Sequence, residues 1–115
     1  MVKPYVPDAG DIIFIDFDPQ VGREQAKRRP ALVLTDLRYN RASGLAVVCP
    51  LTSKVKPYPF TLPVTVGEVE GAVLVDQLKS LDWAGRGAEF HSRVPKLLVS
   101  TVRQYLAVLL QIPTR

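Results

Sequence analysis

The sequence predicts a small β-rich α+β domain in which one C-terminal helix packs on a curled sheet or barrel. The chain has 115 residues, of which 47% are hydrophobic and 23% charged, as expected of one globular domain with a single modest core. Prolines and glycines separate short apolar runs, which is typical of a compact β-rich fold. Helical spacing is evident near the C-terminal end. We therefore treat residues 1–115 as a single domain.

Five apolar runs are expected to form strands. Several are rich in Val and Ile, and all are bounded by glycine, proline or charged turns. In chain order they are DIIFIDF (11–17), ALVLTD (31–36), LAVVCPLT (45–52), FTLPVTV (60–66) and GAVLVDQLK (71–79).

The C-terminal stretch is expected to form an amphipathic helix. Pro95 suits its first turn and Pro113 ends the pattern. The residues at helical spacing are Leu98, Val102, Tyr105, Leu106, Leu109 and Leu110. Such a stripe predicts packing against the sheet.

Positive charge is concentrated in one third of the chain. The formal net charge is +4, and residues 23–56 carry eight Lys or Arg against two acidic residues. This asymmetry is expected if one face of the protein binds a polyanion. It is equally consistent with a basic loop region exposed to solvent.

Cys49 is the only cysteine, so no intrachain disulfide can form and a reducing compartment is expected. Within the apolar run LAVVCPL it is expected to be a buried core residue. We find no hydrophobic stretch of signal-peptide length at the N-terminus and no run long enough to span a bilayer. The expected location is the cytoplasm, without membrane contact.

The sequence gives little support for a metal site or for catalysis by a histidine. A single histidine, His91, and a single cysteine cannot build the usual zinc ligand sets, and His91 is expected to be a surface or turn residue. Asp16 and Asp18 share a strand face and offer a weak Mg²⁺ alternative. We expect no metal and no cofactor.

Functional groups instead gather at predicted strand ends. Arg29 precedes Pro30, which favours an extended backbone, and its guanidinium matches two oxygens of a phosphate. Glu24 can accept a proton or orient the arginine, and Thr52 and Ser53 add hydroxyls. The same residues also fit a surface ion pair beside ordinary strand-end hydroxyls.

The chain resembles the MazF/PemK/Kid family of toxin endoribonucleases, and most closely its MazF branch. The resemblance covers nearly the whole length. Its elements, in order, are VPDAGDIIFIDFDPQVGREQAKRRPALVL, YNRASG, VCPLTSKVKPYPF, VDQLKSLDW and RGAE.

This resemblance implies a small SH3-like β-barrel with short helices that forms a homodimer and cleaves single-stranded RNA, including messenger RNA, at short motifs without a metal. By motif position it implies catalytic roles for Glu24, Arg29 and Thr52. It also implies a small antitoxin of the MazE type, whose acidic disordered tail folds along the basic groove. The implied RNA contacts are Phe17, Gln25, Lys27, Arg28, Ser53, Lys54, Lys56, Tyr58, Gln77 and Lys79.

In the expected reaction the RNA's own 2′-hydroxyl attacks the scissile phosphate. Glu24 is the candidate base, and Arg29 and Thr52 are candidates to bind the phosphate oxygens. The group that protonates the leaving 5′-oxygen is left open between water and Arg29. A gyrase-poisoning toxin of the same fold and a noncatalytic RNA-binding barrel remain alternatives.

Two positions depart from the family pattern. Many members have glycine two residues before the arginine of the Arg-Pro element, where this chain has Lys27. A histidine that some members carry before the Glu-Gln pair is replaced by Arg23, which excludes a mechanism using that histidine.

Overall fold

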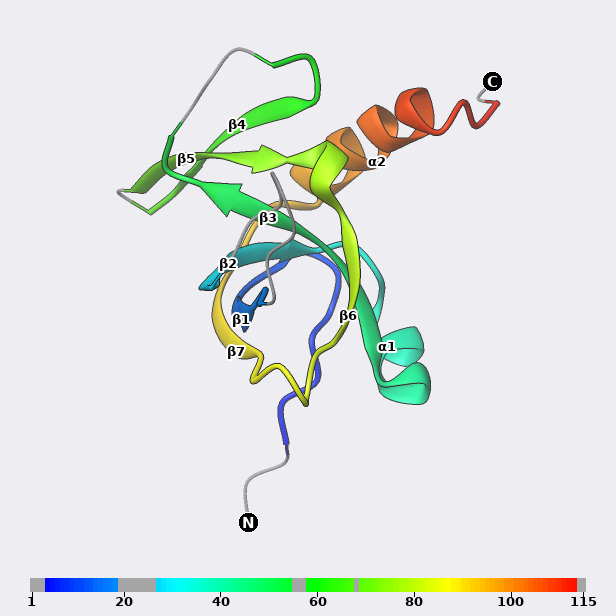
Figure 1. Cartoon of the computed structure of the whole chain (residues 1–115). Helices are drawn as coiled ribbons and strands as arrows, with labels where there is room; N and C mark the ends of the chain where they lie inside the picture. Colours follow the sequence, from blue (N-terminus) through cyan, green and yellow to red (C-terminus); the bar gives the residue numbers. More distant parts are fainter. Residues whose placement is uncertain (1–3, 19–26, 55–57, 68, 114–115) are drawn as a thin grey trace.

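The computed structural model describes residues 4–18, 27–54, 58–67 and 69–113, which fold around one antiparallel sheet of seven strands (Figure 1). Six strands follow one another across the sheet, and β6 pairs with β3 beside this path. Their order is β4 (Thr61–Val66), β5 (Val69–Leu74), β3 (Leu45–Thr52), β2 (Arg28–Val33), β1 (Asp11–Asp16) and β7 (Glu89–Arg93), with β6 spanning Lys79–Asp82. The helices are α1 (Leu37–Ser43) and α2 (Lys96–Leu109), and the 3₁₀ turn η1 spans Val75–Gln77. The predicted β-rich class, with a curled sheet and a C-terminal helix, is confirmed.

Strand β3 joins the two halves of the sheet. Its first part lies between β2 and β6, whereas its last two residues, Leu51 and Thr52, pair with β5. In Figure 1 this strand runs diagonally from α1 to the β4–β5 hairpin. The end of β3 therefore lies where the hairpin meets the rest of the sheet.

Alternate residues of the central strands pack on opposite faces of the sheet. On β1, Ile12 belongs to the core cluster that includes Val99, Val102 and Leu106 of α2. Its neighbour Ile13 belongs to a second cluster, against which Tyr5, Trp83 and Ala88 pack. Burial on both faces explains why these strands read as continuous apolar runs.

Two strand predictions need correction. A strand was expected at 31–36, but the observed strand spans 28–33. It ends before Asp36, because the Asp36 carboxylate accepts a 3.0 Å hydrogen bond from Tyr39 N and begins α1. The run 71–79 is not one strand. The chain turns at η1, so that β5 pairs with the end of β3 and β6 with its beginning.

Helix α1 was not predicted, and the buried side chain of Asn40 fixes it to the domain. Its Nδ2 donates to Pro7 O and Thr35 O, both at 2.8 Å, and its Oδ1 accepts from Thr35 Oγ1 at 2.6 Å. Trp83 Nε1 donates to Asn40 O at 2.9 Å. Because these polar atoms are paired, the amide is buried without an unmet hydrogen bond.

Helix α2 confirms the predicted C-terminal helix, with Pro95 as its N-cap. Val102 and Leu106 are buried as predicted, Val99 joins them, and Leu110 is exposed beyond the end of the helix. Four large apolar side chains on or just beyond α2 remain exposed: Leu97, Val108, Leu110 and Ile112. In the described part of the chain, neither helix has the length and apolar character needed to cross a membrane.

Cys49 is confirmed as a core residue. Its side chain is fully buried and its Sγ lies 3.8 Å from Val75 O. Burial, with a smaller contribution from the charge of Asp76, raises the pKa of this thiol to about 12. The thiol is therefore protonated and unreactive at neutral pH.

Candidate active site

Arg29 and Thr52 are brought together by the pairing of β2 with β3. β2 pairs with β3 from Val33 opposite Val48 to Ala31 opposite Pro50, and Arg29 and Thr52 each lie two residues beyond that last pair. A step of two residues keeps both side chains on the same face. Both residues line one hollow, so pairing in the sheet brings together two side chains that are 23 positions apart in the sequence.

The end of β3 is held in place from its other side by β5. Thr52 pairs with Ala72, and the neighbouring Gly71 approaches the Thr52 backbone closely. A Cβ added to Gly71 would lie 2.7 Å from Thr52 O, which is too short for any residue other than glycine. The Thr52 hydroxyl accepts a 3.1 Å hydrogen bond from Lys54 N. These contacts fix both the backbone and the hydroxyl of Thr52.

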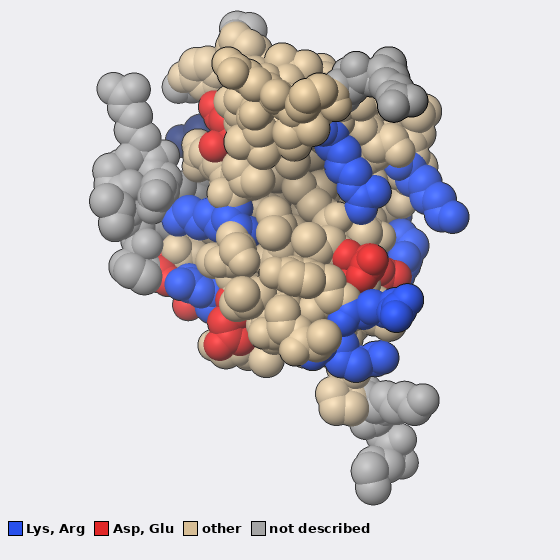
Figure 2. Space-filling model, turned by 90° about the vertical axis from the view of Figure 1, so that its right-hand side faces the viewer, with Lys and Arg blue, Asp and Glu red and all other residues tan. Residues whose placement is uncertain are grey.

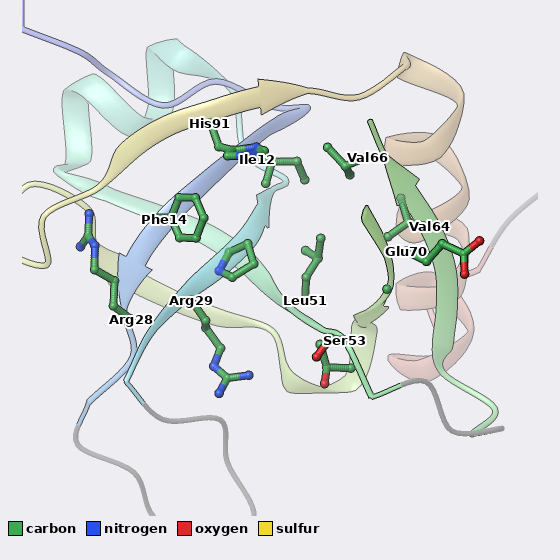
Figure 3. A pocket seen from close by; sticks show the side chains of 13 residues that line it. Ile12, Phe14, Arg28, Arg29, Leu51, Ser53, Val64, Val66, Glu70 and His91 are labelled. Atoms are coloured by element: carbon green, nitrogen blue, oxygen red, sulfur yellow. The ribbon is translucent and has the colours of Figure 1, made fainter. Parts of the chain in front are cut away.

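The hollow beside Arg29 has a volume of about 330 Å³ (Figure 3). Phe14, Ile12 and Leu51 form one apolar wall, and Val64 and Val66 of β4 form the facing wall. In Figure 3 Arg29 and Ser53 lie together at one end, and the Glu70 carboxylate points away from the hollow. The remaining lining residues are Arg28, Pro30, Thr52, Gly71 and His91. The site thus combines an apolar interior with cationic and hydroxyl groups at its end.

The segment 19–26 contains Glu24 and Gln25 and lies outside the described residues, but hydrogen bonds join the residues on either side of it. Asp18 Oδ1 accepts from Lys27 N at 2.7 Å, and Phe17 N donates to Lys27 O at 2.9 Å. Arg86 Nη1 donates to Asp18 O at 2.6 Å and to Asp16 O at 3.1 Å. This network holds the end of β1 against the start of β2.

Lys27 adopts a left-handed backbone conformation, with φ at 63°. Glycine adopts such a φ without the steric cost that a Cβ imposes, and this is the position at which many members of the resembled family have glycine. The lysine therefore adopts this conformation at a cost in backbone energy.

Arg28 is turned toward β7 and the loop before it. Its Nη2 donates to Gly87 O at 2.7 Å and to Glu89 Oε1 at 2.5 Å. Because both partners are substantially exposed, this ion pair contributes little to stability. Arg28 lines the hollow while holding the loop before β7 in place.

The other predicted RNA contacts have different positions. Ser53 lines the hollow, whereas Lys27, Lys54, Tyr58, Gln77 and Lys79 do not. The prediction that Phe17 contacts RNA is wrong. Only 1% of its surface is exposed, because it packs in the second core cluster, so it offers no surface to RNA. Lys56 lies outside the described residues, as do Glu24 and Gln25.

Asp16 and Asp18, the alternative metal pair, both accept hydrogen bonds from backbone amides. Asp16 Oδ1 accepts from Asp18 N at 2.9 Å, and Asp18 Oδ1 accepts from Lys27 N. Within the described ranges no three His, Cys, Asp or Glu side chains gather as a metal site would require. The observed role of both carboxylates is to shape the chain around Lys27.

Sequence reasoning missed two side chains of the hollow, Phe14 and His91. Phe14 was read only as part of a strand. His91 was expected to be a surface or turn residue; it is exposed, but it lies on β7, a strand that was not predicted. Their rings are in edge-to-face contact, with centroids 5.3 Å apart. The alternation of β1 is a signal that could have placed Phe14 on the face opposite Ile13.

Comparisons with known proteins agree with this geometry. Residues 8–110 match the family model described as the PemK-like, MazF-like toxin of type II toxin-antitoxin systems. Over 88 residues the chain is 48% identical to the endoribonuclease toxin MazF of Escherichia coli K12, covering 76% of this chain and 79% of that protein. It is 31% identical over 108 residues to E. coli endoribonuclease PemK, covering 90% and 81%.

Solved structures show the same fold. The crystal structure of MazF from Deinococcus radiodurans superposes with a TM-score of 0.89 at 44% identity, covering 95% of this chain and all of that one. A MazE-MazF crystal structure from the same organism gives a TM-score of 0.84 at 43% identity, with the same coverage. The chain therefore belongs to the PemK-like, MazF-like toxin family of type II toxin-antitoxin systems.

Proposed function

We propose that this chain is a metal-independent endoribonuclease that cuts single-stranded RNA, including messenger RNA, at short sequence motifs and acts as the toxin of a toxin-antitoxin pair. Its relatives are named as endoribonucleases, which supports the enzyme class. The observation that carries the proposal is that Arg29 of β2 and Thr52 of β3 line the same hollow. Its action on messenger RNA would place it in the cytoplasm.

In the proposed reaction the 2′-hydroxyl of the RNA attacks the adjoining phosphate, with Glu24 as the base. Negative charge then grows on the phosphate oxygens in the transition state. The Arg29 guanidinium and the Thr52 hydroxyl stabilise that charge, and the hydroxyl is already held by Lys54 N before the substrate arrives. The products are a 2′,3′-cyclic phosphate and a 5′-hydroxyl. The chain supplies no nucleophile of its own in this scheme, which suits a site built from an arginine and hydroxyls.

The proposal is tested by incubating the purified protein with a long RNA, with and without excess EDTA, and mapping the product ends. We expect the same cuts in both samples, each leaving a 2′,3′-cyclic phosphate and a 5′-hydroxyl. Loss of cleavage in EDTA that Mg²⁺ restores would assign the chemistry to a metal. Binding without cleavage would favour a noncatalytic RNA-binding barrel, and an absence of both would favour a gyrase-poisoning toxin.

The charge on the surface bears on the proposed partners. On the face shown in Figure 2, Lys and Arg side chains lie in several places, most of them in the right-hand part of the view, with acidic side chains between them. An acidic chain would then make local contacts along its length. A disordered acidic tail can do this because it orders as it binds. The MazE-MazF structures support a MazE-like antitoxin as the partner.

We expect the antitoxin tail and RNA to compete for this chain. A peptide from the cognate antitoxin's tail should displace an uncleavable RNA, and inhibition should weaken as salt rises because charge attraction is screened. The proposed homodimer, for which the exposed apolar side chains of α2 offer a surface, should persist in sedimentation of the same mixtures. Simultaneous, independent binding of peptide and RNA at saturation would contradict the shared groove.

A further inference from the structure

Phe14 of β1 and His91 of β7 form an aromatic pair at the wall of the hollow (Figure 3). Their ring centroids are 5.3 Å apart and their planes are inclined by 77°. Phe14 is 37% exposed, and His91 is exposed as well. An edge-to-face pair covers one ring face with the edge of the other ring, which leaves aromatic surface available to a third ring.

A β-bulge gives His91 this position. Ile12 pairs with Ser92 and Ile13 pairs with Phe90, so His91 is an extra residue with no partner in β1. Such bulges bend a strand and redirect a side chain, and they are common at sheet edges and beside active sites. β7 is the last strand on its side of the sheet. The bulge therefore brings the imidazole to the Phe14 side of the sheet, facing the hollow.

The neighbouring aromatic residue of β7 does not share this orientation. Phe90 pairs with Ile13, which faces the second core cluster, and its ring lies 5.8 Å from that of Tyr5. Phe90 is half exposed and does not line the hollow. The same strand thus presents one aromatic ring to each side of the sheet, and the ring that contacts Phe14 is that of His91.

Single-stranded RNA fits this arrangement better than other occupants. Its unpaired bases stack on aromatic rings, including that of histidine, while the phosphates bind arginine. Here the aromatic pair and apolar side chains line the hollow, and Arg29 lies at its end. A flat ring joined to a phosphate would fill both parts. An acidic peptide would satisfy Arg29 but does not require an aromatic wall.

We propose that Phe14 and His91 are a stacking platform for one base of the RNA, next to the phosphate bound at Arg29. This inference rests on the proposed function, because it names the part of the substrate that the hollow receives. The pair contributes to affinity and to the choice of cleavage motif. It takes no part in proton transfer.

The test uses a short single-stranded RNA spanning a mapped cleavage site, with 2′-deoxy at the scissile nucleotide to prevent cleavage. Abasic nucleotides are introduced one position at a time, and the Kd of each RNA is measured for four proteins. These are the wild type, His91→Ala, His91→Phe and, as a matched control on the opposite face, Phe90→Ala. Circular dichroism checks that each variant is folded.

For the wild type, one abasic position next to the scissile phosphate should raise Kd about tenfold, which is the contribution of one stacked base. His91→Ala should raise the Kd of the intact RNA by a similar factor. In this variant the same abasic substitution should change Kd very little. His91→Phe should restore both effects, and Phe90→Ala should leave them unchanged. If His91 had only a structural role, the effect of His91→Ala on Kd would be the same whichever base is missing from the RNA.

Three results would overturn the inference. One is unchanged RNA affinity in folded His91→Ala, and another is a loss that is the same for intact and abasic RNAs. The third is a loss of antitoxin-peptide binding alone, which would assign the pair to a protein partner. Failure of the wild type to cleave the all-ribose RNA would instead contradict the proposed function, so the two failures are distinguishable.

Discussion

An RNA that lacks only the 2′-hydroxyl at the scissile nucleotide should remain uncut by this protein. In the proposed reaction that hydroxyl is the nucleophile, and no side chain of the site replaces it. Arg29 and Thr52 can bind the phosphate of such an RNA but cannot attack it. Electrophoresis of a labelled oligonucleotide with a single deoxy substitution would record the result as full-length substrate.

The control for this experiment is the same oligonucleotide with the deoxy nucleotide moved one position away. It should be cut at close to the normal rate, because its nucleophile is intact. The two oligonucleotides should also bind with similar Kd, which would show that resistance does not arise from lost affinity. Cleavage of the first oligonucleotide would mean that water attacks the phosphate.

Glu24→Gln should lower the single-turnover cleavage rate about 10²- to 10⁴-fold, the usual contribution of a general base. Glutamine keeps the size of the side chain and removes its ability to accept the proton. RNA affinity should hold or rise slightly, because a negative charge is removed near the phosphate backbone. The measurements are a single-turnover rate and a Kd with the uncleavable RNA.

Lys56→Ala is the contrasting variant. It should weaken affinity and reduce the salt dependence of binding by about one phosphate contact, while a saturating protein concentration restores most of the cleavage rate. If both variants only weaken binding in parallel, Glu24 is not the base.

The sequence predicted the strands of the central sheet better than their connections. The 45–52 run was correct at both ends, because β3 is buried and its apolar pattern is continuous. The 71–79 run was read as one strand because η1 keeps the same apolar composition while it redirects the chain. α1 has only seven residues and no apolar stripe, although Asp36 and Gly44 cap its two ends. Local composition therefore identified strands but not the turns between them.

The candidate site residues were named by resemblance, and the pairing of distant strands explains how two of them, Arg29 and Thr52, come to line one hollow. Nothing local in the sequence brings Arg29 and Thr52 to one hollow, since this follows from the pairing of β2 with β3. Phe17 was misassigned because a residue just beyond a strand end can face either core or solvent, and here it is buried. His91 was missed because a bulge depends on how two strands pair.

The left-handed backbone of Lys27 has a consequence for how this protein can change over generations. A selection for thermal tolerance alone would favour glycine there, since glycine relieves the steric cost of that φ. The same replacement would remove a cation beside Arg28 and Arg29, while the backbone hydrogen bonds of residue 27 with Phe17 and Asp18 would remain. A gain in heat resistance at this position would therefore come with one cation fewer for attracting a polyanion, so selection for heat tolerance and selection for RNA affinity would favour different residues there.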